Sequence, residues 1–506
     1  MLLDAVSDAL VLFLSNPMLF GIAVLATAAG IVMGALPGVS STMALAILLP
    51  LTFGMEPEVA IMLLLTVLVA SVFGGSISAI LLGIPGTPGA IVTQFDGYPM
   101  AQQKQAGKAL SHALVGSTVG GLIGVLTLMP IAPLIADLAQ NFRSPEFAML
   151  ALLGLVLLAF ATDGAMLAGL LSGALGLILG MVGIDLVTGY ARYDFGQAFL
   201  QSGIHIVPLT IGVFGITEVL TSIANARTGK LPAIPRIETL KLNFSELRWV
   251  APSWLRGSAI GAFIGAIPAA GSAIAVALAY TIEQRFTKDG GVRFGKGQPR
   301  GIAAPEAANS ALTGGSTIPL ITLGIPGDPM TAILIGALII HGLTPGPAMF
   351  AQNPGIIGAI YGAILLAIVL TFVIGMICFR GFVQVMKLPP AIMMVAITLL
   401  CMVGAFAIRN NFSDLIIMLA LGGLGYLMIG LRIPVAPLVF GVILGPLMEE
   451  NLRRSLIISR GEWTVFLERP VSLGIIVVCL LIIGSAICST WISRAQRAPI
   501  AEAAEE

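Results

Sequence analysis

The stretch Gly265-Ala266-Ile267-Pro268-Ala269-Ala270-Gly271-Ser272 decides how the rest of this chain is interpreted. It lies in the middle of an apolar run, 257–282, that contains no charged residue. Proline removes a helical hydrogen bond and glycine weakens a helix, so a helix is expected to break here. We therefore predict two half-helices joined by a turn at 268–271, with the second half-helix beginning at Ser272.

Basic residues flank this run on both sides, in 227–256 and in 285–300. The positive-inside rule places both flanks in the cytoplasm, so the chain must turn within the membrane. A helix over 257–283 would reach about 40 Å, whereas the hydrocarbon core is about 30 Å thick. We predict a re-entrant hairpin over 257–283; one long kinked span is the alternative that the charge pattern leaves open.

A second copy of this motif lies near the N-terminus. Residues 34–46 align without gaps on 265–277, with six identities in 13 positions, and 74–90 align on 315–331 with nine identities in 17. The two pairs occur in the same order, at offsets of 231 and 241 residues. Matched order at nearly matched spacing indicates an internal duplication.

The two copies differ in the charge of their flanks. The first hairpin, predicted over 26–53, is flanked by acidic residues with no Lys or Arg nearby, whereas the second is flanked by eleven basic residues. The first hairpin is therefore expected to enter from outside. Inverted repeats with Gly/Pro-broken helices at the midplane are typical of secondary transporters.

The composition places the chain in the membrane. Its 506 residues are 57% hydrophobic and 10% charged, which excludes a soluble core, and the net charge of zero argues against a nucleic-acid partner. We predict an all-α polytopic protein with a first membrane repeat (1–225), a cytoplasmic linker (226–256) and a second membrane repeat (257–506).

About ten crossings accompany the two hairpins in this prediction. They are 58–95, 110–139, 146–162, 164–184 and 204–225 in the first half, and 306–342, 354–379, 388–408, 413–431 and 471–493 in the second. Residues 1–25 are ambiguous, and 433–448 are apolar but short for a span. An odd number of crossings per half is what inverts the second half.

Several strings resemble one transporter family. They are Gly34–Gly38, Gly74–Pro88, Phe95-Asp96-Gly97-Tyr98-Pro99-Met100-Ala101 and Ala304-Pro305-Glu306-Ala307-Ala308-Asn309-Ser310. Together they are similar to the large membrane subunit of the tripartite tricarboxylate transporter (TctA) family, over nearly the whole chain. The hairpin tips depart from the family's usual Pro-Gly-x-Gly, reading Pro37-Gly38-Val39-Ser40 and Pro268-Ala269-Ala270-Gly271.

The resemblance implies a place and partners. The protein would sit in a bacterial inner membrane with a small four-helix membrane subunit. A periplasmic solute-binding protein would deliver a di- or tricarboxylate, and an ion gradient would drive its uptake. No cofactor is expected beyond Na⁺ or H⁺ as the coupling ion.

Hydroxyl groups at the hairpin tips are the candidate substrate ligands. The positive end of a half-helix and its free N–H groups favour an anion, and Ser or Thr can donate to a carboxylate. The structural alternative is a plain helix cap, for which these residues are also preferred. The candidate substrate-binding residues are Pro37, Gly38, Ser40, Ser41, Thr42, Pro268, Gly271 and Ser272.

The broken helices at 83–88 and 324–329 are the candidate sites for the coupling cation. Unwound carbonyls and nearby hydroxyls can bind a cation at membrane depth; a kink satisfied by neighbouring helices is the alternative. Asp328 is the most unusual side chain, because a carboxylate in an apolar run is costly. The candidates are Ser76, Gly83, Pro85, Gly86, Thr87, Asn309, Ser316, Thr317, Gly324, Gly327 and Asp328, with Glu306 and Glu218 as weaker ones.

Other classes fit the sequence less well. Residues 290–296 match GxxxxGK, but Gly297 replaces the Ser or Thr of a phosphate-binding loop and no strand precedes it. A protease would need a paired base or a second aspartate, so no enzyme is predicted. A passive anion channel, or a transporter for another small organic anion, remains the alternative to a carboxylate symporter.

Overall fold

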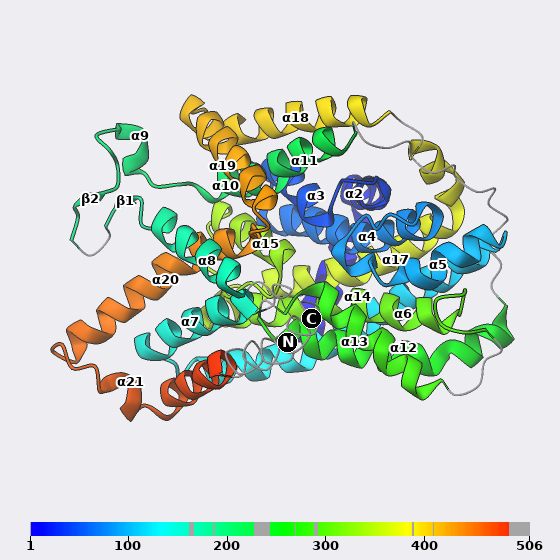
Figure 1. Ribbon diagram of the computed structural model, residues 1–506. Coiled ribbons are helices and arrows are strands. Elements are labelled where there is room, and N and C mark those ends of the chain that lie inside the picture. The colour runs from blue at the N-terminus through cyan, green and yellow to red at the C-terminus, as the bar shows by residue number, and fades with distance from the viewer. Residues whose placement is uncertain are drawn as a thin grey trace, which may run out of the picture. The chain divides into compact units, whose positions relative to one another are not determined.

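The computed structural model describes residues 2–160, 166–185, 188–226, 243–268, 270–287, 292–386, 389–407 and 409–484 (Figure 1). The chain divides into two compact units. The larger contains Met1–Gln140 and His205–Leu431, and the smaller contains Asn141–Ile204 and Arg432–Glu506. Each unit therefore draws on both predicted repeats.

The larger unit is helical wherever it has regular structure in the described residues. Its N-terminal part has α1 (Leu2–Ser15), α2 (Pro17–Ala35), α3 (Ser41–Leu48), η1 (Leu49–Thr52), α4 (Pro57–Leu82), η2 (Pro88–Ala90), α5 (Thr93–Gln102) and α6 (Ala106–Ala139). Its second part has α10 (Ile206–Thr210), the π-helical η3 (Ile211–Ile216), α11 (Thr217–Ala226), α12 (Phe244–Ala266), α13 (Gly271–Phe286), α14 (Arg300–Leu323), α15 (Pro329–Ile340), α16 (Pro347–Gln352), α17 (Pro354–Val385), α18 (Pro390–Ala407) and α19 (Phe412–Gly430).

The smaller unit combines helices with one short β-hairpin. It contains α7 (Ser144–Phe160), α8 (Met166–Gly180), β1 (Gly183–Ile184), β2 (Ala191–Arg192), α9 (Ala198–Gln201), α20 (Ala436–Ile458), α21 (Val465–Glu468) and an apolar helix over Pro470–Gly484. The strands are antiparallel, with Gly183 opposite Arg192. Residues 433–448, expected to be apolar but short for a span, contribute to α20, which has 23 residues and packs on α7 and α8 but is not among the described helices that are long and apolar enough to cross a bilayer.

The membrane class predicted from composition is confirmed. Among the described residues, six helices are long and apolar enough to cross a bilayer, and several shorter apolar helices accompany them. The six are Pro17–Ala35, Pro57–Leu82, Ala106–Ala139, Ile206–Ala224, Pro354–Cys378 and Phe412–Gly430. The crossing count and the inversion of the halves remain predictions.

The first hairpin begins earlier than predicted. Asn16 separates α1 from α2, because its side chain accepts from the N–H groups of Met18 (3.0 Å) and Leu19 (3.4 Å) while Pro17 occupies the first helical position. The incoming arm is therefore α2, starting at 17 instead of 26. The apolar composition on both sides of Asn16 concealed this boundary.

The second hairpin also has a longer incoming arm. Helix α12 starts at Phe244, capped by Asn243, so the helix extends into the range expected to be a linker; residues 227–242 lie outside the described part. Arg256 of α12 donates to both oxygens of Glu283 of α13, at 2.9 and 2.8 Å. The two charges that bound the uncharged run therefore meet at the open end of a helical hairpin.

Glycines bring each incoming arm against a long helix in the same way in both halves. A Cβ at Gly34 or Gly265 would lie within 3.0 Å of a backbone oxygen of the facing helix, that of Ser71 in α4 or of Leu312 in α14. The two contacts are equivalent in the repeat, because Gly34 and Gly265 are 231 residues apart and Ser71 and Leu312 are 241 residues apart, the two offsets found in the sequence. Close helix contact through small residues is common in membranes.

The packing partners of the two halves are exchanged. Helix α6 packs along α14, and α17 packs along α4 (Figure 1). Likewise, the outgoing arm α3 contacts α15, and the outgoing arm α13 contacts η2. Each half therefore supplies the neighbours of the other half's broken helix.

Candidate functional site

Two adjacent serines at the tip of the first hairpin differ in their hydrogen bonding. Ser40 caps α3, because its Oγ accepts from the N–H of Met43 at 3.1 Å. Ser41, 2% exposed, has a buried Oγ without a hydrogen-bond partner among the described residues. Pro37, Gly38 and Thr42 are half-buried beside them. The predicted tip thus contains one ordinary cap and one unpaired hydroxyl.

The left-handed turn at the first tip is close to α11. Gly38 has φ +82°, and a Cβ there would lie 2.7 Å from the Oγ of Ser222. A side chain at this position would be strained and would also displace Ser222. Ser222 is a residue at the tip that the sequence did not single out.

The second tip is built differently from the expectation. Helix α13 begins at Gly271, with φ +73°, and its N-cap Ala270 has no capping side chain. Ser272 stands inside the first turn instead of starting the helix, so the prediction of a half-helix beginning at Ser272 is corrected by one residue. Pro268, Gly271 and Ser272 are half-buried; Ala269 lies outside the described residues.

The two helix breaks have nearly identical geometry. Gly83 (φ +67°, ψ 22°) is the C-cap of α4 and Gly324 (φ +70°, ψ 23°) is the C-cap of α14, and both are left-handed. The chain then folds back: Gly86 donates its N–H to the carbonyl of Gly75 at 3.3 Å, and Gly327 lies against Ser316 at the equivalent place. The matched Gly-Ile-Pro-Gly strings therefore form matched breaks, with Pro85 and Pro326 inside them.

After the break the two copies diverge. Asp328 caps α15 in a capping box, with the Thr331 N–H donating to its Oδ1 at 2.8 Å and the Thr331 Oγ1 accepting from its N–H at 2.8 Å. Thr87, at the equivalent position, has a buried Oγ1 with no partner among the described residues. The structure therefore gives Asp328 a structural partner and leaves Thr87 available.

Asn309 lies beside the first break. A Cβ at Gly89 would collide with the Asn309 amide, and the Asn309 Nδ2 is buried without a partner in the described part of the chain. By contrast, the Thr317 Oγ1 donates to the Thr313 carbonyl at 2.7 Å, within its own helix. Of the candidate cation ligands, Thr87 and Asn309 thus keep unpaired polar atoms.

Ser76 has a partner that the sequence did not predict. Its Oγ donates to the Oε2 of Glu306 at 2.6 Å, Ser117 donates to the same oxygen at 3.1 Å, and Thr93 donates to Oε1. Glu306 is fully buried. Thr93 and Ser117 lie 213 and 189 residues from Glu306 along the chain, and no local pattern marks them.

The loop that resembles a phosphate-binding loop holds a carboxylate of the protein itself. The backbone N–H groups of Gly295, Gly297 and Gln298 donate to the Asp96 Oδ1 at 2.8, 2.9 and 2.8 Å. The Tyr280 hydroxyl donates to Oδ2 at 2.8 Å. Successive N–H groups make an anion-binding concavity, here filled by Asp96, in agreement with the interpretation that this is no nucleotide site.

Each of the three histidines has a polar contact, but only that of His205 is local in the sequence. His112 lies 3.4 Å from Glu246, the His205 ring accepts from the N–H of Val207 at 3.4 Å, and His341 lies 3.3 Å from the Thr52 hydroxyl. The expectation that each is a satisfied residue is not met at His112, whose Nδ1 is buried without a hydrogen-bond partner among the described residues.

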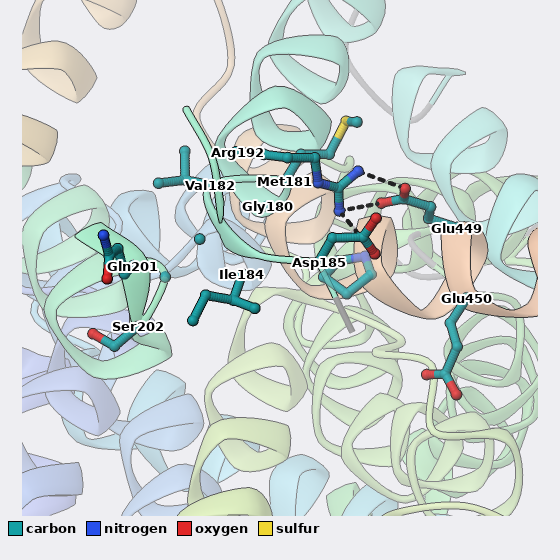
Figure 2. Close-up of a pocket in the computed structure, with 13 residues that line it drawn as sticks. Gly180, Met181, Val182, Ile184, Asp185, Arg192, Gln201, Ser202, Glu449 and Glu450 are labelled. Carbon is teal, nitrogen blue, oxygen red and sulfur yellow. Dashed lines mark hydrogen bonds and ion pairs between the residues drawn. The ribbon is translucent and has the colours of Figure 1, made fainter. Parts of the chain in front are cut away.

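The smaller unit has a cavity of its own, of about 330 Å³, beside the β-hairpin (Figure 2). Arg192 reaches the Glu449 carboxylate with two nitrogens, at 2.7 and 3.2 Å, and lies 3.7 Å from Asp185. Arg453 also contacts Asp185 and Glu449, each at 2.8 Å. Both cations are thus committed to carboxylates, which makes this cavity a poor match for an anionic substrate.

Comparisons with known proteins place the chain. The family model described as "Tripartite tricarboxylate transporter TctA family" matches residues 20–440. An Agrobacterium vitis protein, "Uncharacterized 52.8 kDa protein in TAR-I ttuC' 3'region", is 35% identical over 451 residues, covering 89% of each chain. A second one from that organism, "Uncharacterized protein in TAR-II ttuC' 3'region", is 36% identical over 225 residues, covering 44% of this chain and 93% of its own. No solved structure matches. The chain is therefore a multi-pass membrane component of tricarboxylate transport and belongs to the tripartite tricarboxylate transporter TctA family.

Proposed function

We propose that this protein is the transporting subunit of a cation-coupled symporter that imports small di- or tricarboxylates. In this proposal it sits in a bacterial inner membrane beside a small four-helix membrane subunit. It receives substrate from a periplasmic solute-binding protein. Family membership supports transport and partner subunits; the ion coupling and the delivery route are our extension.

The observation that carries the proposal is a set of unpaired polar atoms at the hairpin tip and the helix break. The Ser41 Oγ, the Thr87 Oγ1 and the Asn309 Nδ2 are buried without partners among the described residues. Native proteins rarely leave buried polar groups unpaired, and each such group costs about 1–3 kcal/mol. All three can donate a hydrogen bond, which a carboxylate oxygen accepts, so a bound carboxylate would supply the missing partners.

The exchanged packing of the two halves supports a pseudo-two-fold arrangement. When two equivalent surfaces meet about a two-fold axis, each contact occurs twice with the partners exchanged. The pairs α6–α14 and α17–α4, and α3–α15 and α13–η2, follow this rule. Together with the opposite charge of the hairpin flanks, this favours inverted repeats with re-entrant hairpins, which transporters use for alternating access.

Ion coupling follows from the charge of the substrate. Moving an anion into a negative interior costs about 2.3 kcal/mol per charge per 100 mV, so co-transported cations must at least offset that charge. The sequences of the two hairpin tips (36–42 and 267–272) and of the two breaks contain no Lys or Arg to neutralise it. The unwound carbonyls of 83–88 and 324–329 are the proposed cation-binding region, whereas the unpaired atoms of Thr87 and Asn309 are assigned to the carboxylate because both can donate a hydrogen bond.

Reconstitution tests the proposal. Proteoliposomes containing this subunit, its small partner and a loaded binding protein are given ¹⁴C-citrate or ¹⁴C-succinate under sodium and proton gradients imposed separately. Saturable uptake that depends on a cation gradient and on the binding protein is expected. Passive, unsaturable flux independent of both would instead identify a channel and refute the proposal.

A further inference from the structure

Glu306 is a buried carboxylate whose shell consists of hydroxyl groups. Its Oε2 accepts from Ser76 (2.6 Å) and Ser117 (3.1 Å), and its Oε1 accepts from Thr93. The residue is completely buried, and the four side chains come from α4, α5, α6 and α14. Ser76 precedes the first helix break and Thr93 follows it, so Glu306 joins the two sides of that break.

No described cation is paired with Glu306. On the helices around α14, Asp137, Arg248 and Arg285 are exposed and Glu58 is half-buried at the start of α4, whereas the remaining charged residues have other partners. Glu246 of α12 pairs with Lys108 and His112 of α6, and Glu283 of α13 pairs with Arg256 of α12 and Arg300 of α14. Asp96 of α5 accepts a hydrogen bond from Tyr280 of α13, and Asp328 caps α15. An ionised carboxylate without a cationic partner is expensive to bury. Binding a cation would remove that penalty.

The geometry favours a proton over a metal ion. The hydroxyl oxygens of Ser76 and Ser117 lie at hydrogen-bond distance from the carboxylate itself, so the shell is already closed around Glu306. An ion between these oxygens would require every one of them to move outward, whereas a proton requires only that one hydroxyl turn from donor to acceptor. Serine and threonine hydroxyls can do either, so the shell satisfies both protonation states.

We propose that Glu306 is the proton-binding residue of the transport cycle, an inference that rests on the proposed symport function. A proton from the outer side forms an O–H bond with the Glu306 carboxylate when substrate is loaded. The same bond breaks toward the cytoplasm after substrate release, which returns the carboxylate. One proton thus enters per cycle through this site. Its binding changes the hydrogen bonds that Glu306 accepts from Ser76 before the first helix break and from Thr93 after it.

Glu306→Gln tests the proposal because glutamine keeps the shape of the protonated acid but cannot release a proton. In proteoliposomes with both partners, two reactions are compared: ¹⁴C-citrate accumulation driven by one pH unit, and exchange of internal for external citrate without a gradient. Glu450→Gln, which neutralises an exposed carboxylate on α20, is the matched control. A pH electrode in lightly buffered medium at pH 8 records protons taken up per citrate.

The expected result separates coupling from binding. One pH unit is worth about tenfold accumulation per coupled proton, so Glu306→Gln should lose about that factor while retaining exchange within about twofold. Proton uptake per citrate should fall by one, and Glu450→Gln should match the wild type. Should Glu306→Gln prove unfolded, Ser117→Ala takes its place, because it removes one donor to the Glu306 carboxylate: the pH dependence of proton-driven uptake should shift from that of the wild type, and an unchanged pH dependence would count against Glu306 as the proton site.

Three results would overturn the inference. If wild-type uptake follows only sodium, with no protons taken up, Glu306 is not the coupling site although the proposed symport stands. If Glu306→Gln accumulates citrate normally under a pH gradient, the residue is structural. If the wild type ignores both gradients, the symport proposal fails together with the inference.

Discussion

The Tyr280 hydroxyl donates a 2.8 Å hydrogen bond to the Asp96 Oδ2, connecting the outgoing arm of the second hairpin to α5, which follows the break in the first half. Asp96 is fully buried and also gathers three backbone N–H groups from the loop before α14. One carboxylate therefore fixes a helix of each half and the loop between α13 and α14.

Removing this carboxylate should release the loop. Asp96→Ala leaves three N–H groups without their acceptor, two of them buried at about 1–3 kcal/mol each, whereas Tyr280→Phe removes one bond to a charged acceptor, worth about 1.5–3 kcal/mol. We expect Asp96→Ala to lower the Tm more than Tyr280→Phe and to speed tryptic cleavage at Arg293 and Lys296. Equal cleavage rates in the wild type and Asp96→Ala would show that the loop is held by other contacts.

Adjacent serines at the first tip should respond oppositely to mutation. Ser40→Ala removes a helix cap and should cost about 1 kcal/mol of stability with little change in citrate affinity. Ser41→Ala removes an unpaired buried hydroxyl. If that hydroxyl donates to the substrate, the affinity should fall roughly ten- to a hundredfold while the Tm stays unchanged, since such a bond is worth about 1.5–3 kcal/mol.

Thermal unfolding and binding of ¹⁴C-citrate by the purified complex measure the two effects. The assignment of Ser41 to the substrate is refuted by normal binding with a lowered Tm. Ser272→Ala, in the first turn of α13, extends the comparison to the second tip.

The sequence predicted the breaks because they are local. Gly83 and Gly324 adopt the left-handed conformation that only glycine takes readily, and Pro85 and Pro326 cannot continue a helix. The sequence did not predict the helix boundary at Asn16, because the runs of residues on both sides of it are apolar. It also did not predict the full length of α20. The charges of α20 at 449–454 form ion pairs that only the folded smaller unit reveals.

The site was predicted only in part for the same reason. Hairpin-tip and break residues stand in motifs, whereas the shell of Glu306 comes from positions 189 to 230 residues away. Single-sequence reasoning has no signal for such pairing. The repeat could have pointed to a special role for Glu306, because the equivalent position in the first half is Leu65 and only the second half has a carboxylate there.

The close glycine contacts should matter equally in both halves. Gly34→Ala and Gly265→Ala each place a Cβ within 3.0 Å of a backbone oxygen, so each should destabilise the protein by about 1–3 kcal/mol. Gly21→Ala, in α2 but with nothing within 4 Å of the added Cβ, is the control and should be neutral or stabilising. Tm values of the three variants measure this; a large loss in only one half would count against equivalent packing.

A pH effect is expected at the start of α12. Hydrogen bonds from His112 and Lys108 hold the pKa of Glu246 at about 2, below its usual 4.5. Because the folded-state pKa is lower, the ionised carboxylate stabilises the fold above pH 4.5, and this contribution is lost as the pH falls from 4.5 toward 2. Glu246→Gln should therefore flatten the fall of Tm over that window, and a curve parallel to the wild type would show that other groups dominate.

The inverted arrangement makes the sharpest prediction about topology. Glu56 lies just after the first hairpin and Arg285 near the end of the second, and both are exposed. If the halves are inverted, these positions lie on opposite sides of the bilayer, because the acidic flank faces outward and the basic flank faces the cytoplasm. In a cysteine-free background, a membrane-impermeant maleimide added to intact cells should label Glu56→Cys at once and Arg285→Cys only after permeabilisation. Labelling of both from one side would leave the sequence repeat intact but remove its inversion, and with it the main structural reason to place both hairpin tips at the midplane.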